Sequence, residues 1–252
     1  MRRFFMSGEG TMSEKKSSGV LETIRTIVYS VLIAMVVRTF AYEPFNIPSK
    51  SMVPTLLVGD YLFVSKLSYG YSRYSLPFGP PLFEGRIWES PPERGDVAVF
   101  KLPSDNSTDY IKRVIGLPGD TVQVVGGILH INGEPVRRER IEDYVDPDTG
   151  AVFRQYIETL PNGAQHRIIE ESDNALFDQT PPFRVPEGHY FMMRDNRDNS
   201  SDSRANVGYV PAENLIGRAE ILFFSTDGSA RLWEFWKWPA AIRFSRIFDR
   251  VS

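Results

Sequence analysis

The sequence predicts a mainly β protein: an antiparallel-sheet core with an inserted smaller β module, preceded by one N-terminal transmembrane helix. Three observations predict this fold. One apolar segment near the N-terminus is long enough to cross a membrane. Short segments rich in Val, Phe and Tyr alternate with Gly, Asp and Pro turns over most of the remaining chain. Neither an internal repeat nor a strand–helix–strand alternation is present, which argues against a parallel sheet.

The apolar segment is predicted to be a transmembrane helix over residues 19–41. Residues 26–37 carry no charge, and the whole segment supplies the roughly 20 residues that a hydrocarbon core of about 30 Å requires. A cleaved signal peptide or a buried core helix would also be apolar. The residues MVVRTFAYEPF, however, offer a poor small-residue cleavage site. We therefore expect a retained span.

Charges on the two sides of the span predict its orientation. Four basic residues precede it: Arg2, Arg3, Lys15 and Lys16. Among residues 42–61, in contrast, only Lys50 is basic. Basic flanks stay in the cytoplasm, so residues 1–18, which are polar and Ser/Lys-rich, should form a disordered cytoplasmic tail. The rest of the chain is expected on the outer face of the membrane.

Five short segments are predicted to be strands of the core: 60–66, 96–101, 109–114, 189–193 and 219–224. Residues 124–186 hold turn signals of their own, including Asn132-Gly133, the strongest hairpin signal in the chain. Further turns are expected at DPDTG (146–150) and PNG (161–163). We therefore predict an inserted β-rich module at 124–186, with the core formed by residues 42–123 and 187–232.

Two aromatic segments show no clear periodicity. Residues 69–88 are rich in aromatic residues and proline and predict a long loop that could lie against lipid. Residues 233–252 combine Trp233, Trp236 and Trp238 with basic residues. That composition suits a membrane interface, and it equally suits a C-terminal helix docked on the domain.

Composition excludes several classes of protein and site. The chain has 252 residues, a net charge of −3 and an isoelectric point near 5.7, which argues against a nucleic-acid partner bound through a basic surface. With no cysteine, disulfides and thiolate nucleophiles are excluded. The three histidines lie outside any metal-binding pattern. Neither a metal nor a cofactor is expected.

The segment IPSKSMVPTL at residues 47–56 places two serines in a proline-restricted turn just beyond the span. Alone, it is more typical of a surface turn than of an active site. A serine needs a base to take its proton, and no histidine has a suitable context. A lysine is the alternative if it can be made half neutral at pH 7, which costs about 4.6 kcal/mol. Burial can supply a shift of that size.

Lys112, in DYIKRVIGL, lies in a segment that otherwise has the composition of a sheet interior. Alone, the pair Lys112–Arg113 is more typical of an exposed strand face. Together with IPSKSMVPTLLVGD, RGDVAVFK and RDNRDNSSDSRANVGYVP, however, DYIKRVIGLPGD resembles the successive conserved segments of bacterial type I signal peptidase. The resemblance covers roughly residues 20–123 and 187–224.

The resemblance implies roles for individual residues. Ser51 would be the nucleophile and Lys112 the general base. Ser49 would form the oxyanion hole together with the Ser51 backbone N–H. The supporting positions would be Ser200, which orients the lysine amine; Met52, which lines the site; and Asp202 with Arg204, a structural ion pair behind the site.

Two positions depart from the family's usual glycines. Lys50 stands between the two serines, and we expect its side chain to point away from the site because neighbouring side chains on an extended segment diverge. Arg194 stands before DNRDNS. Its charge could lower the pKa of Lys112 by repulsion, or its bulk could crowd the amine.

The function implied by the resemblance is that of a monomeric, single-pass peptidase in the bacterial cytoplasmic membrane. It would remove signal peptides from exported preproteins on the outer, periplasmic face, cleaving after small residues, and its partners would be these preproteins and the lipid bilayer. Two alternative functions are less consistent with the sequence. A Ser–Lys peptidase with another substrate, such as a self-cleaving repressor, is disfavoured by the span and the lack of a helix-turn-helix. A non-catalytic anchored binding module is disfavoured because Ser51 and Lys112 are both present.

Overall fold

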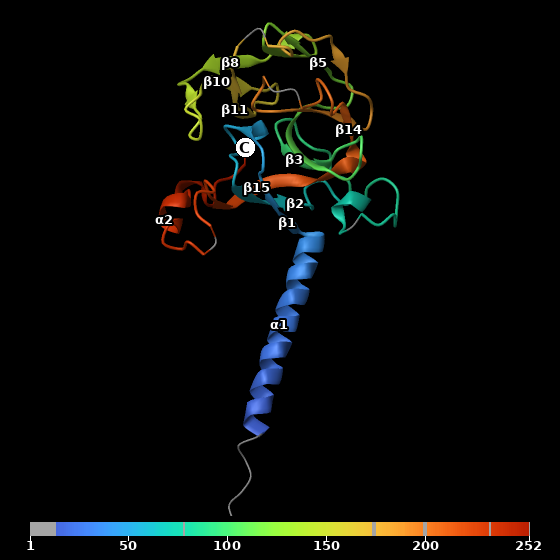
Figure 1. Cartoon of the computed structure of the whole chain (residues 1–252). Helices are drawn as coiled ribbons and strands as arrows, with labels where there is room; N and C mark the ends of the chain where they lie inside the picture. Colours follow the sequence, from blue (N-terminus) through green and yellow to red (C-terminus); the bar gives the residue numbers. More distant parts are fainter. Residues whose placement is uncertain (1–13, 78, 173–174, 199–200, 232, 252) are drawn as a thin grey trace, which may run out of the picture.

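The computed structural model describes residues 14–77, 79–172, 175–198, 201–231 and 233–251. A single long helix, α1 (Glu14–Phe40), projects from one end of a β-rich domain (Figure 1). Residues 1–13 of the predicted disordered tail lie outside the described residues, and the helix begins inside the remainder of that tail, at Glu14.

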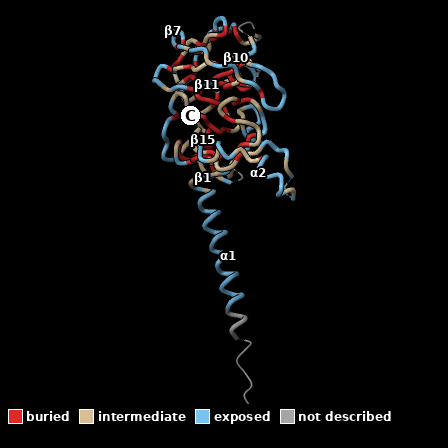
Figure 2. Tube along the Cα trace, turned by 90° about the vertical axis from the view of Figure 1, so that its left-hand side faces the viewer, coloured by how far each residue is buried: buried red, intermediate tan, exposed pale blue. Residues whose placement is uncertain are grey.

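Helix α1 contains one candidate membrane span, Gly19–Phe40, of 22 residues. At about 1.5 Å per residue, this span matches a hydrocarbon core of about 30 Å. None of it is buried in the protein (Figure 2). The alternative of a buried core helix is therefore wrong, and so large an exposed apolar surface is stable only in an apolar surrounding such as lipid.

The core of the domain is an antiparallel sheet, which confirms the predicted fold class. Its strands, in spatial order, are β1 (Tyr42–Asn46), β2 (Asp60–Ser65), β15 (Leu215–Ser225), β3 (Val97–Lys101), β4 (Asp109–Gly116), β13 (His189–Met193) and β14 (Tyr209–Pro211). Each of the five predicted core strands overlaps a strand of this sheet. The fully buried Leu62 and Val64 of β2 pack with Val97 of β3 in one of its hydrophobic clusters.

Two smaller sheets lie at the end of the domain farthest from α1 (Figure 1). One contains β8 (Arg137–Arg140), β9 (Tyr144–Val145), β10 (Val152–Thr159) and β11 (Gln165–Glu170). The other contains β5 (Thr121–Val125), β6 (Ile128–Ile131), β7 (Glu134–Pro135) and β12 (Phe183–Arg184). Asn132 and Gly133, with φ of 56° and 86°, join β6 to β7. Both residue types tolerate this left-handed conformation, as the sequence pattern predicts.

The inserted strands share a core with the large sheet. Strand β5 begins at Thr121, before the predicted boundary at 124. Its Val122 packs in one cluster with Ile115 of β4 and Phe191 of β13. The described strands of the inserted module therefore pack against the large sheet at this cluster.

Hydrogen bonds and isolated bridges attach the two aromatic segments to the rest of the domain. Residues 69–88 include the short helix η2 (Arg73–Ser75), and Arg86 fastens this loop by donating to four backbone carbonyls. The described part of the C-terminal segment, 233–251, contains the short helices α2 (Trp238–Ala241) and η4 (Phe244–Arg246). It docks through isolated bridges to β15 and the adjoining Thr226. The described part of 233–252 thus contacts the domain, and its helices are single turns.

Candidate active site

Ser51 lies in a short 3-10 helix, η1 (Lys50–Met52), within the link between β1 and β2. The link is anchored by the buried side chains of Ile47, Met52 and Leu56. The Ser51 side chain is nearly inaccessible, with the residue 2% exposed, and its carbonyl accepts a hydrogen bond from Asn196 N–H at 3.2 Å. The buried side chains and the hydrogen bond from Asn196 therefore hold the turn that carries the Ser51 hydroxyl.

Lys112 lies on β4, opposite Ala98 of β3. Its Nζ atom is 3.1 Å from Ser51 Oγ and donates a hydrogen bond to the Ile111 carbonyl at 2.7 Å. The residue is 4% exposed, so the exposed-strand interpretation of this segment is wrong. Burial, assisted by the positive charge of Arg194, lowers the pKa of Lys112 to about 7, against the opposing effects of Asp202 and Asp195. Near neutral pH, a large fraction of this amine can therefore carry a free electron pair.

Ser49 lies beside the nucleophile candidate. Its Oγ donates to Ser51 Oγ at 3.3 Å, and its backbone is extended, with φ of −132° and ψ of 156°. The Ser49 hydroxyl is therefore close enough to donate a hydrogen bond to a substrate group that Ser51 Oγ attacks. Met52, the next residue in the helix, is fully buried.

Asp202 and Arg204 form a buried ion pair, with Arg204 Nη2 2.8 Å from Asp202 Oδ2. Asp202 also accepts a hydrogen bond from the backbone N–H of Arg194 at 3.4 Å. The pair thus supports the chain segment that follows β13. Ser200, predicted to orient the lysine amine, lies outside the described residues.

The chain is similar to known signal peptidases. The model of the family "Signal peptidase, peptidase S26" matches residues 20–224. Signal peptidase I of Rickettsia typhi is 41% identical over 94% of this chain and 96% of its own length. That of Rickettsia conorii is 40% identical over 90% of this chain and 91% of its own. A solved signal peptidase I of Enterococcus faecalis V583 is 31% identical and covers 51% of this chain and 97% of its own, at a TM-score of 0.32.

The chain belongs to the signal peptidase I family of serine peptidases (peptidase S26). Signal peptidase I acts on preproteins, so the substrate of the site is a polypeptide. The N-terminal apolar helix is consistent with membrane anchoring. In the described part of the chain, no group of three or more His, Asp or Glu side chains is placed to hold a metal ion.

Arg194 extends the signal peptidase I site with an unusual buried cation. Met193 of β13 pairs with Arg113 of the antiparallel strand β4, so Arg194, which follows Met193, lies near Lys112, which precedes Arg113. Arg194 is 6% exposed, and its Nε and Nη1 atoms have no hydrogen-bond partner among the described residues. Of the two effects expected for Arg194, repulsion is the one evident here, since its charge lowers the pKa of Lys112.

Besides Asp202 and Arg204, two further charged pairs brace the site, and neither was predicted from the sequence. Arg113 and Asp195 pair beneath the dyad. Arg197 pairs with Glu158 of the inserted strand β10, and both are almost fully buried. Arg197 holds the pKa of Glu158 at about 2, with help from His166 and against the effect of burial. The signal was the cluster RDNRD, which directly follows an apolar strand and whose charges can be buried there only in pairs.

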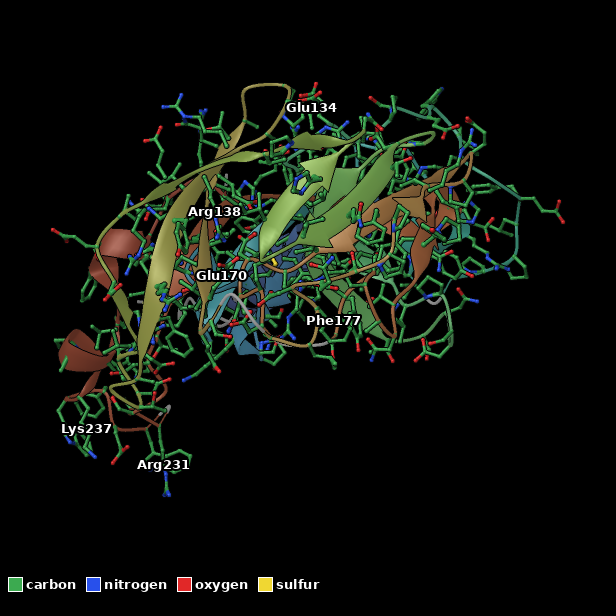
Figure 3. All side chains as sticks on the ribbon, turned by 90° about the horizontal axis from the view of Figure 1, so that it is seen from above. Glu134, Arg138, Glu170, Phe177, Arg231 and Lys237 are labelled. Carbon is green, nitrogen blue, oxygen red and sulfur yellow. The ribbon has the colours of Figure 1, made fainter. Side chains whose placement is uncertain are left out.

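A further ion pair, between a partly buried arginine and a buried glutamate, lies within the inserted strands. Arg138 of β8 and Glu170 of β11 approach to 2.7 Å (Figure 3). Burial raises the pKa of Glu170 to about 7, although the charges of Arg138 and Arg197 oppose the shift. This pair ties β8 to β11, whereas the Arg197–Glu158 pair joins the inserted strands to the segment that follows β13.

Proposed function

We propose that this chain is a membrane-anchored serine endopeptidase that removes N-terminal signal peptides from exported preproteins, cleaving after small residues. Ser51 is the nucleophile and neutral Lys112 the general base. The observation that carries this proposal is the approach of Lys112 Nζ to 3.1 Å from Ser51 Oγ, in surroundings that lower the pKa of the amine to about 7. A base with a pKa near the working pH is the most effective.

The proposed reaction proceeds through an acyl-enzyme. Lys112 takes the Ser51 proton as Oγ attacks the scissile carbonyl carbon, and the resulting oxyanion is bound by the Ser49 hydroxyl and the Ser51 backbone N–H. The Lys112 ammonium then gives its proton to the leaving amine, which becomes the N-terminus of the mature protein. A water deprotonated by Lys112 hydrolyses the Ser51 ester and releases the signal peptide.

Two strand edges support an extended substrate next to the dyad. Strand β1 is an edge strand of the large sheet. Strand β4 pairs with β13 only along Arg113–Gly116, so that residues 109–112 pair with β3 alone among the described strands. Pairing of a peptide with such an edge is a common mode of recognition. A preprotein strand lying there would bring its scissile bond toward Ser51.

A groove of about 670 Å³ extends this region toward the membrane helix. It is lined by Phe45 of β1, Asp109 of β4 and Ile216 of β15, and also by Met35 and Arg38 of α1. A signal peptide leaving the bilayer beside α1 would therefore enter the groove before it reaches the dyad.

The proposed orientation places the N-terminus in the cytoplasm and the β domain on the outer face of the cytoplasmic membrane. The basic N-terminal flank supports it. The loop around η2 and the segment around α2 both lie at the end of the domain from which α1 emerges (Figure 1). Trp88 and Trp233 are 81% and 66% exposed, as expected of side chains at a bilayer surface.

Processing of a preprotein by the purified chain in detergent tests the proposal. Ser51→Ala and Lys112→Ala should each abolish cleavage while the fold is retained, and Arg137→Ala, an exposed cation on β8, should cleave like wild type. All required groups come from one chain, so the cleavage rate per enzyme molecule should be the same at every enzyme concentration. Near-normal processing by Lys112→Ala would contradict the dyad.

A further inference from the structure

Lys50, the residue between the two serines, is bound to the inserted strands. Its Nζ atom lies 3.0 and 2.7 Å from the two carboxylate oxygens of Asp146 and 3.0 Å from Asp148 Oδ2. The side chain points away from the dyad, as predicted, but it is not free. Asp146 follows β9, and Asp148 lies in the turn that leads to β10.

Contacts within its own turn hold Asp146 in place independently of Lys50. The residue is 5% exposed, and its Oδ1 accepts hydrogen bonds from the backbone N–H groups of Asp148 and Thr149 at 2.9 and 3.1 Å. Its own N–H and carbonyl close the turn with Ala151 and Gly150. The carboxylate therefore has little freedom and offers Lys50 a rigid anchor.

The charges of the pair are stable near neutral pH. Hydrogen bonds from Lys50 and the turn backbone lower the pKa of Asp146 although burial opposes this shift. The hydrogen bonds to Asp146 and Asp148 raise the pKa of Lys50. The contact is therefore an ion pair throughout the range in which Lys112 changes its charge.

The backbone of Lys50 is held from the other side. Its carbonyl accepts a hydrogen bond from Asn196 Nδ2 at 3.4 Å, and Asn196 N–H donates to the Ser51 carbonyl at 3.2 Å. Asn196 thus holds the backbone of the turn that carries Ser51, and Asp146 holds the side chain of Lys50 in the same turn. These two anchors come from separate parts of the chain.

We propose that Lys50 is a positioning residue for Ser51: its ion pair with Asp146 and Asp148 uses the inserted strands to hold the Ser51 hydroxyl within reach of Lys112 Nζ. This inference rests on the proposed function of Ser51 and Lys112. It assigns the inserted module a part in the reaction through Asp146 and Asp148, which act on the position of Ser51. A displacement of about 1 Å can cost on the order of 100-fold in rate, so a loosened turn should slow the reaction.

The test is the preprotein processing assay with Lys50→Met, Asp146→Asn and the double variant. Each single variant should lower kcat about 10-fold, within the range that small misplacements produce, and leave KM nearly unchanged. The double variant should be no slower than the slower single variant, because both remove one interaction. Lys50→Arg keeps the positive charge and should retain most of the wild-type kcat. The pH at which activity is half-maximal should stay the same, since Lys112 is untouched.

Arg137→Met is the matched control, because it removes an exposed ion pair with Glu139 from the same module and should leave kcat unchanged. If Lys50→Met fails to fold, Asp148→Asn, whose carboxylate is half-exposed, carries the test with a smaller fall in kcat. An unchanged kcat in the folded variants, or multiplicative losses in the double variant, would overturn the inference. An inactive wild type or an active Ser51→Ala would instead overturn the proposed function itself.

Discussion

Arg113 and Asp195 form a bidentate ion pair on the face of β4 opposite Lys112. Arg113 Nε and Nη2 donate to Asp195 Oδ1 and Oδ2 at 2.8 and 2.7 Å, and the two residues are 1% and 0% exposed. Asp195 also accepts a hydrogen bond from Thr55 Oγ1 at 2.6 Å. The pair therefore joins the strand that carries the amine to the segment that follows the Ser51 turn.

Asp195→Ala should lower the free energy of unfolding by about 3–5 kcal/mol, because it leaves a buried guanidinium without its counter-charge. Urea unfolding of the full chain in detergent measures this loss. Arg137→Ala, which breaks an exposed pair, should change it by less than about 1 kcal/mol. A double replacement of Arg113 and Asp195 by Met and Leu should be less harmful than Asp195→Ala, and equal losses would argue against the pair as the cause.

Ser49→Ala should lower kcat about 100- to 1000-fold with little change in KM, because one oxyanion donor typically contributes that much. Steady-state kinetics on a preprotein measure both constants. Ser49→Thr keeps the hydroxyl and should retain much of the activity. A loss confined to KM would mean that Ser49 only binds substrate.

Arg194→Met should move the pH dependence of kcat/KM to higher pH. Only neutral Lys112 can act as the base, so wild-type activity should rise with pH through about 7, the pKa set by burial and by Arg194. Removal of the Arg194 charge raises the pKa of Lys112, and at pH 7 a smaller fraction of the amine is then neutral. A profile that coincides with the wild type, or shifts to lower pH, would exclude this role for Arg194.

Local patterns in the sequence predicted much of the fold and the dyad. The Val/Phe-rich segments at β2, β3 and β4 became strands because alternating or fully apolar runs must be buried on a sheet. Asn132-Gly133 formed its hairpin because both residues tolerate positive φ. Ser51 and Lys112, 61 residues apart, could be assigned only through the family resemblance, since neither segment alone outweighed its ordinary structural interpretation.

Contacts between segments far apart in the chain could not be predicted from the sequence. Lys50 and Asp146 lie 96 residues apart, and their contact depends on how the inserted strands pack on the large sheet. Strand β5 joined the core of that sheet because Val122 fits against Phe191, a fit that turn signals do not encode. The C-terminal segment forms the short helix α2 in its described part, with Pro239 in the first turn, where proline is favoured.

The most direct test of the account is the titration of the Lys112 amine itself in the folded chain. Lysine labelled with 13C at Cε, followed by NMR across pH and assigned by comparison with Lys112→Met, reports this pKa without any turnover. The account predicts a midpoint at about 7. A midpoint near 10.5, the ordinary value for a lysine in water, would mean that the amine is hydrated and charged, and would contradict the account.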